Sequence, residues 1–197
     1  MKKLKYLLVL VLIAIIHPVY ANEININSNN AVLYNLNDNR IIYEKNKDQK
    51  VSIASLTKLM TALVAIENID NLNDYVSFKQ SDYDKLIQQD ASGSSLKKDK
   101  KYTYEDLLYG LLLESGADCA NALARLTAGN EKNFVIKMNE KAEELGMKNS
   151  SFSNPIGLDD EKNYSTVQDV SILLREDLRN PILKNILTTF THSVSFG

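Results

Sequence analysis

Strands are scarce in this sequence, and the scarcity limits the folds open to it. After the first 21 residues, only residues 31–36 and 41–43 form convincing β-prone runs. Residues 37–40 between them are rich in Asn and Asp, which tolerate turn conformations, so the two runs predict a β-hairpin. An isolated two-stranded ribbon is marginally stable in water. The hairpin must therefore pair with further strands or pack against other elements.

The rest of the chain has mostly helical patterning. Leu59, Leu63 and Ile66 have the spacing of one helix face, and residues 103–106 have the form of a capping box. Residues 81–101 are polar and predict a loop on the surface. We predict helices over residues 52–68, 103–114, 118–127, 131–145 and 165–178, followed by a last apolar segment over residues 182–187.

The first 21 residues have the features of an export signal. Lys2, Lys3 and Lys5 precede an apolar run over residues 7–16, and Ala21 suits a cleavage site. The apolar run is about half as long as a membrane-spanning helix requires. We therefore predict a signal peptide over residues 1–21 and an exported, extracytoplasmic protein made of residues 22–197.

Composition argues against several classes of function. Without residues 1–21 the chain has 20 Lys and Arg against 25 Asp and Glu, a net charge of −5, which disfavours a nucleic-acid partner. Cys119 is the single cysteine, and we expect it to be a small buried side chain. His192 is the single histidine after residue 21, so a histidine-rich metal site is excluded. We interpret the acidic residues 159–161 as a solvated loop, and we predict neither a metal nor a cofactor.

Ser55 and Lys58 lie three residues apart at the predicted start of a helix. Side chains at this spacing share a helix face, so the two can meet. The positive end of the helix and burial both disfavour the Lys58 ammonium, and a neutral amine can activate Ser55 as a nucleophile. In the alternative interpretation, Ser52 or Ser55 only caps the helix and Lys58 points into water. The pattern alone leaves both open.

Two further segments accompany this pair, in order along the chain. The three segments are ASLTKLMT at residues 54–61, LLYGLLLESG at residues 107–116 and NPIGLD at residues 154–159. Together they closely resemble the low-molecular-mass penicillin-binding proteins, the serine D-Ala-D-Ala carboxypeptidases of peptidase family S11. The similarity extends over roughly residues 31–196. It implies an α/β (α+β) chain with a β-lactamase/transpeptidase-like fold, in which a helical subdomain accompanies an antiparallel sheet.

The resemblance also assigns roles to single residues. It implies that Ser55 is the acylated nucleophile, that Lys58 is its general base, and that Ser115 relays a proton to the leaving amine. Without the resemblance, Ser115 would be interpreted as the cap of the helix that follows. The family usually has Asn where this chain has Ala117, and Asn121 lies one helical turn further on.

The family's Lys-Thr-Gly motif is absent between residue 59 and Gly197. In the family this motif lies on a strand beside the nucleophile. We therefore expect residues 22–197 to be a partial peptidase domain with an incomplete sheet, truncated before its C-terminal strands. The alternative is a protein that naturally lacks half its sheet and is inactive or completed by another chain. We also expect little or no turnover by the 197-residue chain itself.

The resemblance implies an enzyme that removes the terminal D-alanine from peptidoglycan pentapeptide stems through an acyl-enzyme. β-Lactams are then expected as inhibitors, and membrane association through a further C-terminal segment is possible. Two alternatives remain at this stage. One is a non-catalytic or degenerate cell-wall binding protein, which the departure at Ala117 and the missing motif suggest. The other is a β-lactamase, which the segment at residues 154–158 disfavours.

Overall fold

The computed structural model describes residues 25–84, 86 and 91–194. The predicted signal peptide lies outside these residues. The described elements, in chain order, are β1 (Ala31–Asn35), β2 (Arg40–Lys45), the 3-10 helix η1 (Ala54–Leu56), α2 (Thr57–Ile66), β3 (Tyr75–Ser77), the 3-10 helix η2 (Gln80–Asp82), β4 (Lys101–Thr103), α3 (Tyr104–Leu113), α4 (Ala117–Ala128), α5 (Glu131–Glu144), α6 (Val167–Arg179) and α7 (Pro181–Leu187).

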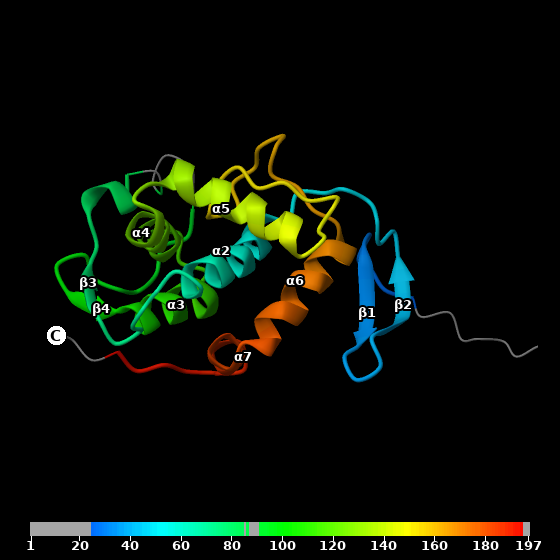
Figure 1. The fold of residues 1–197 in the computed structure, drawn as a ribbon, viewed down its shortest axis with the longest axis horizontal. Helices are drawn as coiled ribbons and strands as arrows, with labels where there is room; N and C mark the ends of the chain where they lie inside the picture. Colours follow the sequence, from blue (N-terminus) through cyan, green and yellow to red (C-terminus); the bar gives the residue numbers. More distant parts are fainter. Residues whose placement is uncertain (1–24, 85, 87–90, 195–197) are drawn as a thin grey trace, which may run out of the picture.

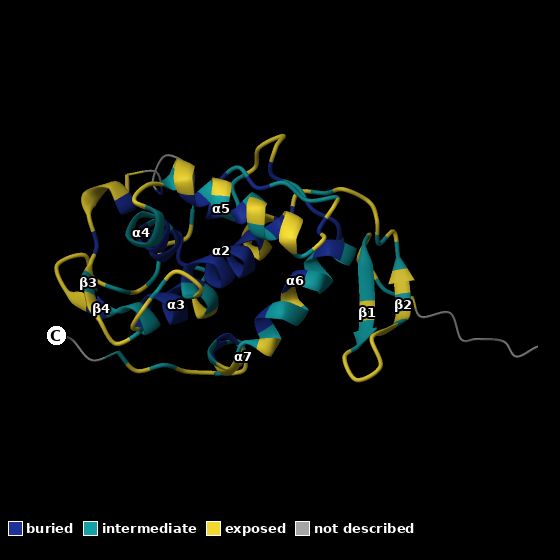
Figure 2. Ribbon diagram, viewed as in Figure 1, coloured by how far each residue is buried: buried dark blue, intermediate teal, exposed yellow. Residues whose placement is uncertain are grey.

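Helix α2 lies at the centre of the molecule, and the other long helices surround it (Figure 1). Residues 57–65 are all buried, so this helix has no solvent-facing stripe (Figure 2). It packs against α3, α4, α5 and α6. A helix that is buried all round requires apolar or small side chains on every face, and Leu59, Ala62 and Leu63 meet that requirement. The core therefore forms around the element that follows Ser55.

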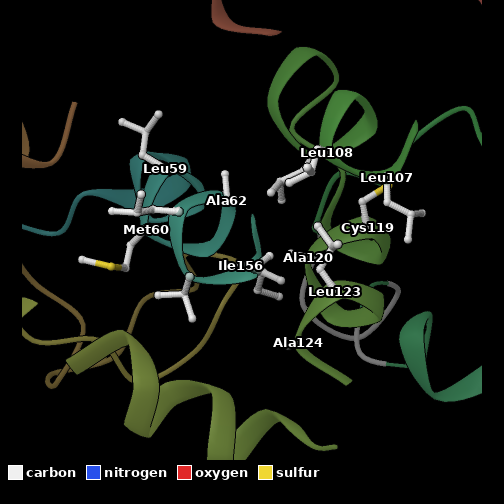
Figure 3. Packing of buried hydrophobic residues seen from close by; sticks show 14 of the residues in the cluster. Leu59, Met60, Ala62, Leu107, Leu108, Cys119, Ala120, Leu123, Ala124 and Ile156 are labelled. Atoms are coloured by element: carbon white, nitrogen blue, oxygen red, sulfur yellow. The ribbon is translucent and has the colours of Figure 1, made fainter. Parts of the chain in front are cut away.

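Helix α4 approaches α2 and α3 closely because its inner face carries small side chains. Cys119, Ala120 and Ala124 are fully buried there, beside Leu107 and Leu108 of α3 (Figure 3). Small residues let helix backbones approach, and the larger leucines fill the remaining space. The expectation that Cys119 is a small buried side chain is confirmed.

Local capping signals place the helix starts where the sequence predicts them. The Thr103 hydroxyl accepts from the amide of Asp106, and the Asp106 carboxylate accepts from the amide of Thr103, which completes the predicted capping box. Thr166 caps α6 in the same way through the amide of Asp169. Asn130 and Asn180 supply the caps of α5 and α7.

The predicted hairpin forms as the antiparallel pair β1–β2, with an irregular register between Leu33 and Tyr34. It lies at one end of the molecule and packs against α6, where Arg175 donates a hydrogen bond to the Tyr34 hydroxyl at 3.2 Å (Figure 1). The expectation of only two strands is wrong. A second antiparallel pair, β3–β4, aligns Val76 after α2 with Tyr102 just before α3. Each of its strands has only three residues, too few for a period-two pattern to stand out.

Within the described residues, no helix combines the length and the apolar character needed to cross a lipid bilayer.

Asp177 of α6 is buried without compensation. Its side chain is 1% exposed, and neither carboxyl oxygen has a hydrogen-bond partner among the described residues. Burial, assisted by the negative charges of Glu176 and Glu67, raises the pKa of Asp177 to about 8. The folded protein thus holds a proton there that the unfolded chain releases near pH 4. Deprotonating Asp177 is therefore harder in the folded protein, and the free energy of unfolding falls as the pH rises from about 4 to about 8.

We expect Asp177→Asn to stabilise the protein, because the amide cannot ionise. The gain in the free energy of unfolding should be about 1–3 kcal/mol at pH 8 and should shrink as the pH approaches 4. Thermal or urea unfolding at pH 5, 6.5 and 8 measures it. Glu140→Gln, at an exposed position of α5, is the matched control and should show no such trend. A gain that is equal at pH 5 and pH 8 would contradict this account of Asp177.

Candidate active site

Ser55 lies on the short 3-10 helix η1, and the α-helix begins two residues later at Thr57. The sequence predicted a single helix from about residue 52, so this boundary is corrected. Ala54, the first residue of η1, has a positive φ of 44°. The Ser55 side chain remains exposed at this turn, open to a substrate.

Neither candidate cap serine caps the helix. The residue before α2 has no side-chain capping bond, and the Ser52 hydroxyl instead donates to the Asp159 carboxylate at 2.5 Å. Lys58 is not in solvent either, since it is 5% exposed. The structure thus contradicts the alternative in which these residues only cap a helix and point into water.

Lys58 and Ser55 are in contact, as their spacing predicts. The Lys58 Nζ lies 3.1 Å from the Ser55 Oγ and 2.9 Å from the carbonyl oxygen of Ile156. The two contacts approach the amine from different segments, because Ile156 lies 98 residues further along the chain. The lysine amine is therefore held between the serine hydroxyl and a fixed backbone acceptor.

Burial lowers the pKa of Lys58 below its ordinary value of 10.5, because the charged ammonium loses hydration. The Asp118 carboxylate opposes this shift but has the smaller effect. The fraction of Lys58 present as a neutral amine is consequently larger at any given pH than for a lysine in water. A neutral amine has the lone pair that a general base requires.

Ser115 lies on the turn between α3 and α4, with a positive φ of 57°. It is not the cap of α4, because the N-cap is Gly116 and makes no side-chain capping bond. The Ser115 hydroxyl makes no hydrogen bond with the part of the chain that the structure describes. The interpretation of Ser115 as a helix cap is therefore wrong, and a strained backbone holds its hydroxyl available for another partner.

Asp118, in the first turn of α4, is a residue that sequence reasoning missed. It is 1% exposed, and its carboxylate accepts from the backbone and hydroxyl of Ser94 and from the amide of Cys119, at 2.7–2.9 Å. The amide of Ala117 donates to the carbonyl of Ser92 at 2.8 Å. These bonds fix the loop around residues 92–94 to the Ser115 turn. An acid within a run of small apolar residues was the available signal in the sequence.

Ala117 is fully buried, and its methyl group supplies no hydrogen bond. The Asn121 amide donates to the carbonyl of Asp82 at 3.0 Å, which ties α4 to η2. His192 also has partners away from Ser55. Its ring stacks on the Tyr109 ring, with 3.7 Å between ring centroids, and its Nε2 lies 2.8 Å from the Asp106 carboxylate. Neither Asn121 nor His192 has a hydrogen bond to Ser55 or Lys58.

No group of three or more potential His, Cys, Asp or Glu metal ligands gathers among residues 25–84, 86 and 91–194. Asp159, from the acidic run, accepts a hydrogen bond from Ser52.

A turn at residues 154–158 lies against the segment that carries Ser55. Gly157 has a φ of 86°, and a Cβ built on it would lie 2.0 Å from the carbonyl oxygen of Ala54 and 3.1 Å from the amide nitrogen of Ser55. Only glycine fits such an approach, for reasons of both φ and space. Backbone therefore touches backbone directly beneath the serine.

Comparisons with known proteins identify the family of the chain. The family model described as D-alanyl-D-alanine carboxypeptidase, peptidase family S11, matches residues 17–197. The chain is 33% identical over 169 residues to the D-alanyl-D-alanine carboxypeptidase DacF of Bacillus subtilis, covering 86% of this chain and 43% of that protein. It is 33% identical over 155 residues to a D-alanyl-D-alanine endopeptidase of Haemophilus influenzae, covering 79% and 52%.

Solved structures give the same result. The crystal structure of the Streptomyces K15 DD-transpeptidase superimposes with a TM-score of 0.83 at 29% identity, covering 89% of this chain and 71% of that one. The D-alanyl-D-alanine carboxypeptidase of Mycobacterium tuberculosis superimposes with a TM-score of 0.75 at 27% identity, covering 89% and 69%. The α+β, transpeptidase-like fold predicted from the sequence is confirmed. The chain spans about half the length of the relatives in the preceding paragraph.

We expect Gly157→Ala to displace the turn that carries Ser55, because the added methyl collides with backbone that cannot rotate away. The cost should be about 2–4 kcal/mol in the free energy of unfolding, combining strain at a positive φ with overpacking. Gly146→Ala is the matched control: its φ of 75° is similar, but nothing lies within 4 Å of the added carbon. Urea unfolding compares the two. Equal losses would show that the contact with Ala54 contributes nothing.

Proposed function

Because the chain belongs to the D-alanyl-D-alanine carboxypeptidase family, peptidase family S11, we propose that it is a serine carboxypeptidase of peptidoglycan. It removes the terminal D-alanine from pentapeptide stems through an acyl-enzyme on Ser55. The observation that carries the proposal is the contact of the exposed Ser55 hydroxyl with the buried Lys58 amine at 3.1 Å.

In the proposed acylation, the neutral Lys58 amine accepts the Ser55 proton while the Ser55 Oγ bonds to the carbonyl carbon between the two D-alanines. The C–N bond then breaks, and the leaving nitrogen takes a proton that the Lys58 ammonium supplies. Ser115, on its strained turn, is the proposed relay for that proton. Water later attacks the ester carbon, releases the shortened stem and restores the Ser55 hydroxyl.

β-Lactams are proposed to acylate the same serine. In that case the ring amide takes the place of the peptide bond, and the opened ring stays attached because its nitrogen cannot diffuse away.

The pH dependence of the acylation rate should follow the protonation state of Lys58. The acylation rate should rise with pH and level off above the Lys58 pKa, which burial places below 10.5.

We further propose an exported, extracytoplasmic location, with peptidoglycan stems as the substrate met there. This proposal is supported by the basic and apolar pattern of residues 1–21. Association with the membrane remains a proposal that rests on the family resemblance alone.

We expect fluorescent penicillin to label the full-length protein, and Ser55→Ala to abolish the label because no nucleophile remains. Lys58→Met should reduce the labelling rate by about a hundredfold or more, the usual scale for a lost general base. Ser171→Ala is the control, since its hydroxyl bonds the Gln168 carbonyl within α6. Gel fluorescence against time at several pH values measures the rates, and release of D-alanine from a pentapeptide measures turnover.

Two results would replace the proposal. Binding of peptidoglycan without penicillin labelling would favour the non-catalytic protein that the buried methyl of Ala117 suggests. Rapid penicillin hydrolysis without release of D-alanine would favour a β-lactamase.

A further inference from the structure

We propose that Asn154 is a positioning residue for catalysis, which sets the Ile156 carbonyl as a fixed acceptor that aims the Lys58 amine at Ser55. The proposal rests on the function proposed for Ser55 and Lys58. Its first evidence is that the Ile156 carbonyl is the only described partner of the Lys58 amine besides the nucleophile itself.

Asn154 builds the turn that presents this carbonyl. Its Oδ1 accepts from the amides of Ile156, Gly157 and Leu158, at 3.2, 2.8 and 3.0 Å. Its Nδ2 donates to the carbonyl of Leu158 at 3.1 Å. One buried side chain thus gathers three consecutive amides on the inside of the turn, and the carbonyl of Ile156 points instead to Lys58.

The turn is also fastened to α2 one helical turn beyond Lys58. The buried Thr61 hydroxyl donates to the Pro155 carbonyl at 2.6 Å. Lys58 and Thr61 lie at i and i+3 on one helix face, so two neighbouring carbonyls of the turn dock on two neighbouring side chains of the helix. The Ile156 side chain is buried in the core between α2 and α4 (Figure 3).

The number of N–H groups on the lysine amine explains why a carbonyl partner orients Lys58. A backbone carbonyl only accepts, so it takes one N–H of Lys58 in either protonation state. In the neutral amine this leaves one N–H and the lone pair to be oriented. With Nζ tethered at 2.9 Å from Ile156 and 3.1 Å from Ser55, the lone pair is available on the side of the Ser55 hydroxyl.

The turn also keeps water from the amine. Pro155 and Ile156 are buried, and burial is the larger influence on the Lys58 pKa. Asp118 of α4 is the charged group that acts on Lys58 from a packed neighbouring helix, and it acts in the opposite direction. Loosening the turn should therefore hydrate Lys58 and move its pKa upward, toward 10.5.

The test follows the Lys58 titration directly, with no substrate. In protein carrying ¹³C-labelled lysine, the Cε shift of Lys58 is followed against pH, and the signal is assigned by its loss in Lys58→Arg. We expect Asn154→Ala to raise the Lys58 pKa by about one unit, which lowers the neutral fraction about tenfold at lower pH. In the full-length protein, the penicillin acylation rate should fall by a similar factor, with its rising limb shifted to higher pH.

Asn139→Ala is the matched control. Asn139 also bonds a backbone through both ends of its amide, donating to the Phe152 carbonyl at 2.8 Å and accepting from the Phe152 amide at 3.0 Å. It holds the chain two residues before Asn154 but does not touch the turn that reaches Lys58. It should lower thermal stability and leave the Lys58 pKa unchanged.

A second pair of variants, at Thr61, tests the proposal even if Asn154→Ala does not fold. Thr61→Val removes the bond to Pro155 and should raise the Lys58 pKa, whereas Thr61→Ser keeps the hydroxyl and should not. An unchanged Lys58 pKa in folded Asn154→Ala, or in Thr61→Val if Asn154→Ala fails to fold, would overturn the proposal. Because the titration needs no acylation, a chain that never labels with penicillin still tests it.

Discussion

The burial of the Lys58 amine is the constraint on which the rest of the site depends. Taking an ammonium out of water is unfavourable, so a buried lysine shifts toward the neutral form or finds hydrogen-bond partners. Lys58 does both, with Ser55 and the Ile156 carbonyl as partners. The enclosure of α2 by four other helices keeps this side chain dry. The helical core is thus a condition for the proposed chemistry as well as a scaffold for it.

The backbone near Ser55 and Ser115 is strained at two positions. Ala54 and Ser115 both have positive φ, although neither is glycine. Such conformations are unfavourable and persist only where surrounding contacts hold them. Here the contacts are the close approach of Gly157 to Ala54 and the network around Asp118. The strain therefore marks the two turns that place the Ser55 and Ser115 hydroxyls.

Local signals explain which features the sequence could predict. The starts of α3 and α6 were predictable because the Thr103 and Thr166 caps act over only three residues. The contact of Ser55 with Lys58 is also local, since it spans one turn. The strands β3 and β4 were missed because their pairing joins residues about 25 positions apart in three-residue segments. The role of Asn154 in holding the turn that reaches Lys58 was missed for a related reason. The Ile156 carbonyl lies 98 residues from Lys58 in the sequence, and an asparagine before proline predicts only a turn.

Lys58 and Asp177 are both buried ionisable groups, and burial lowers the stability of the folded protein in different pH ranges for the two. Lys58 has a lowered pKa, so its burial lowers stability below pH 10.5 and this loss is recovered only as the pH rises toward that value. Asp177 has a raised pKa, and its loss grows between about pH 4 and pH 8. Lys58 is surrounded by oriented acceptors, whereas Asp177 has no partner among the described residues. This organised burial of Lys58 supports the proposal that the lysine acts as a general base.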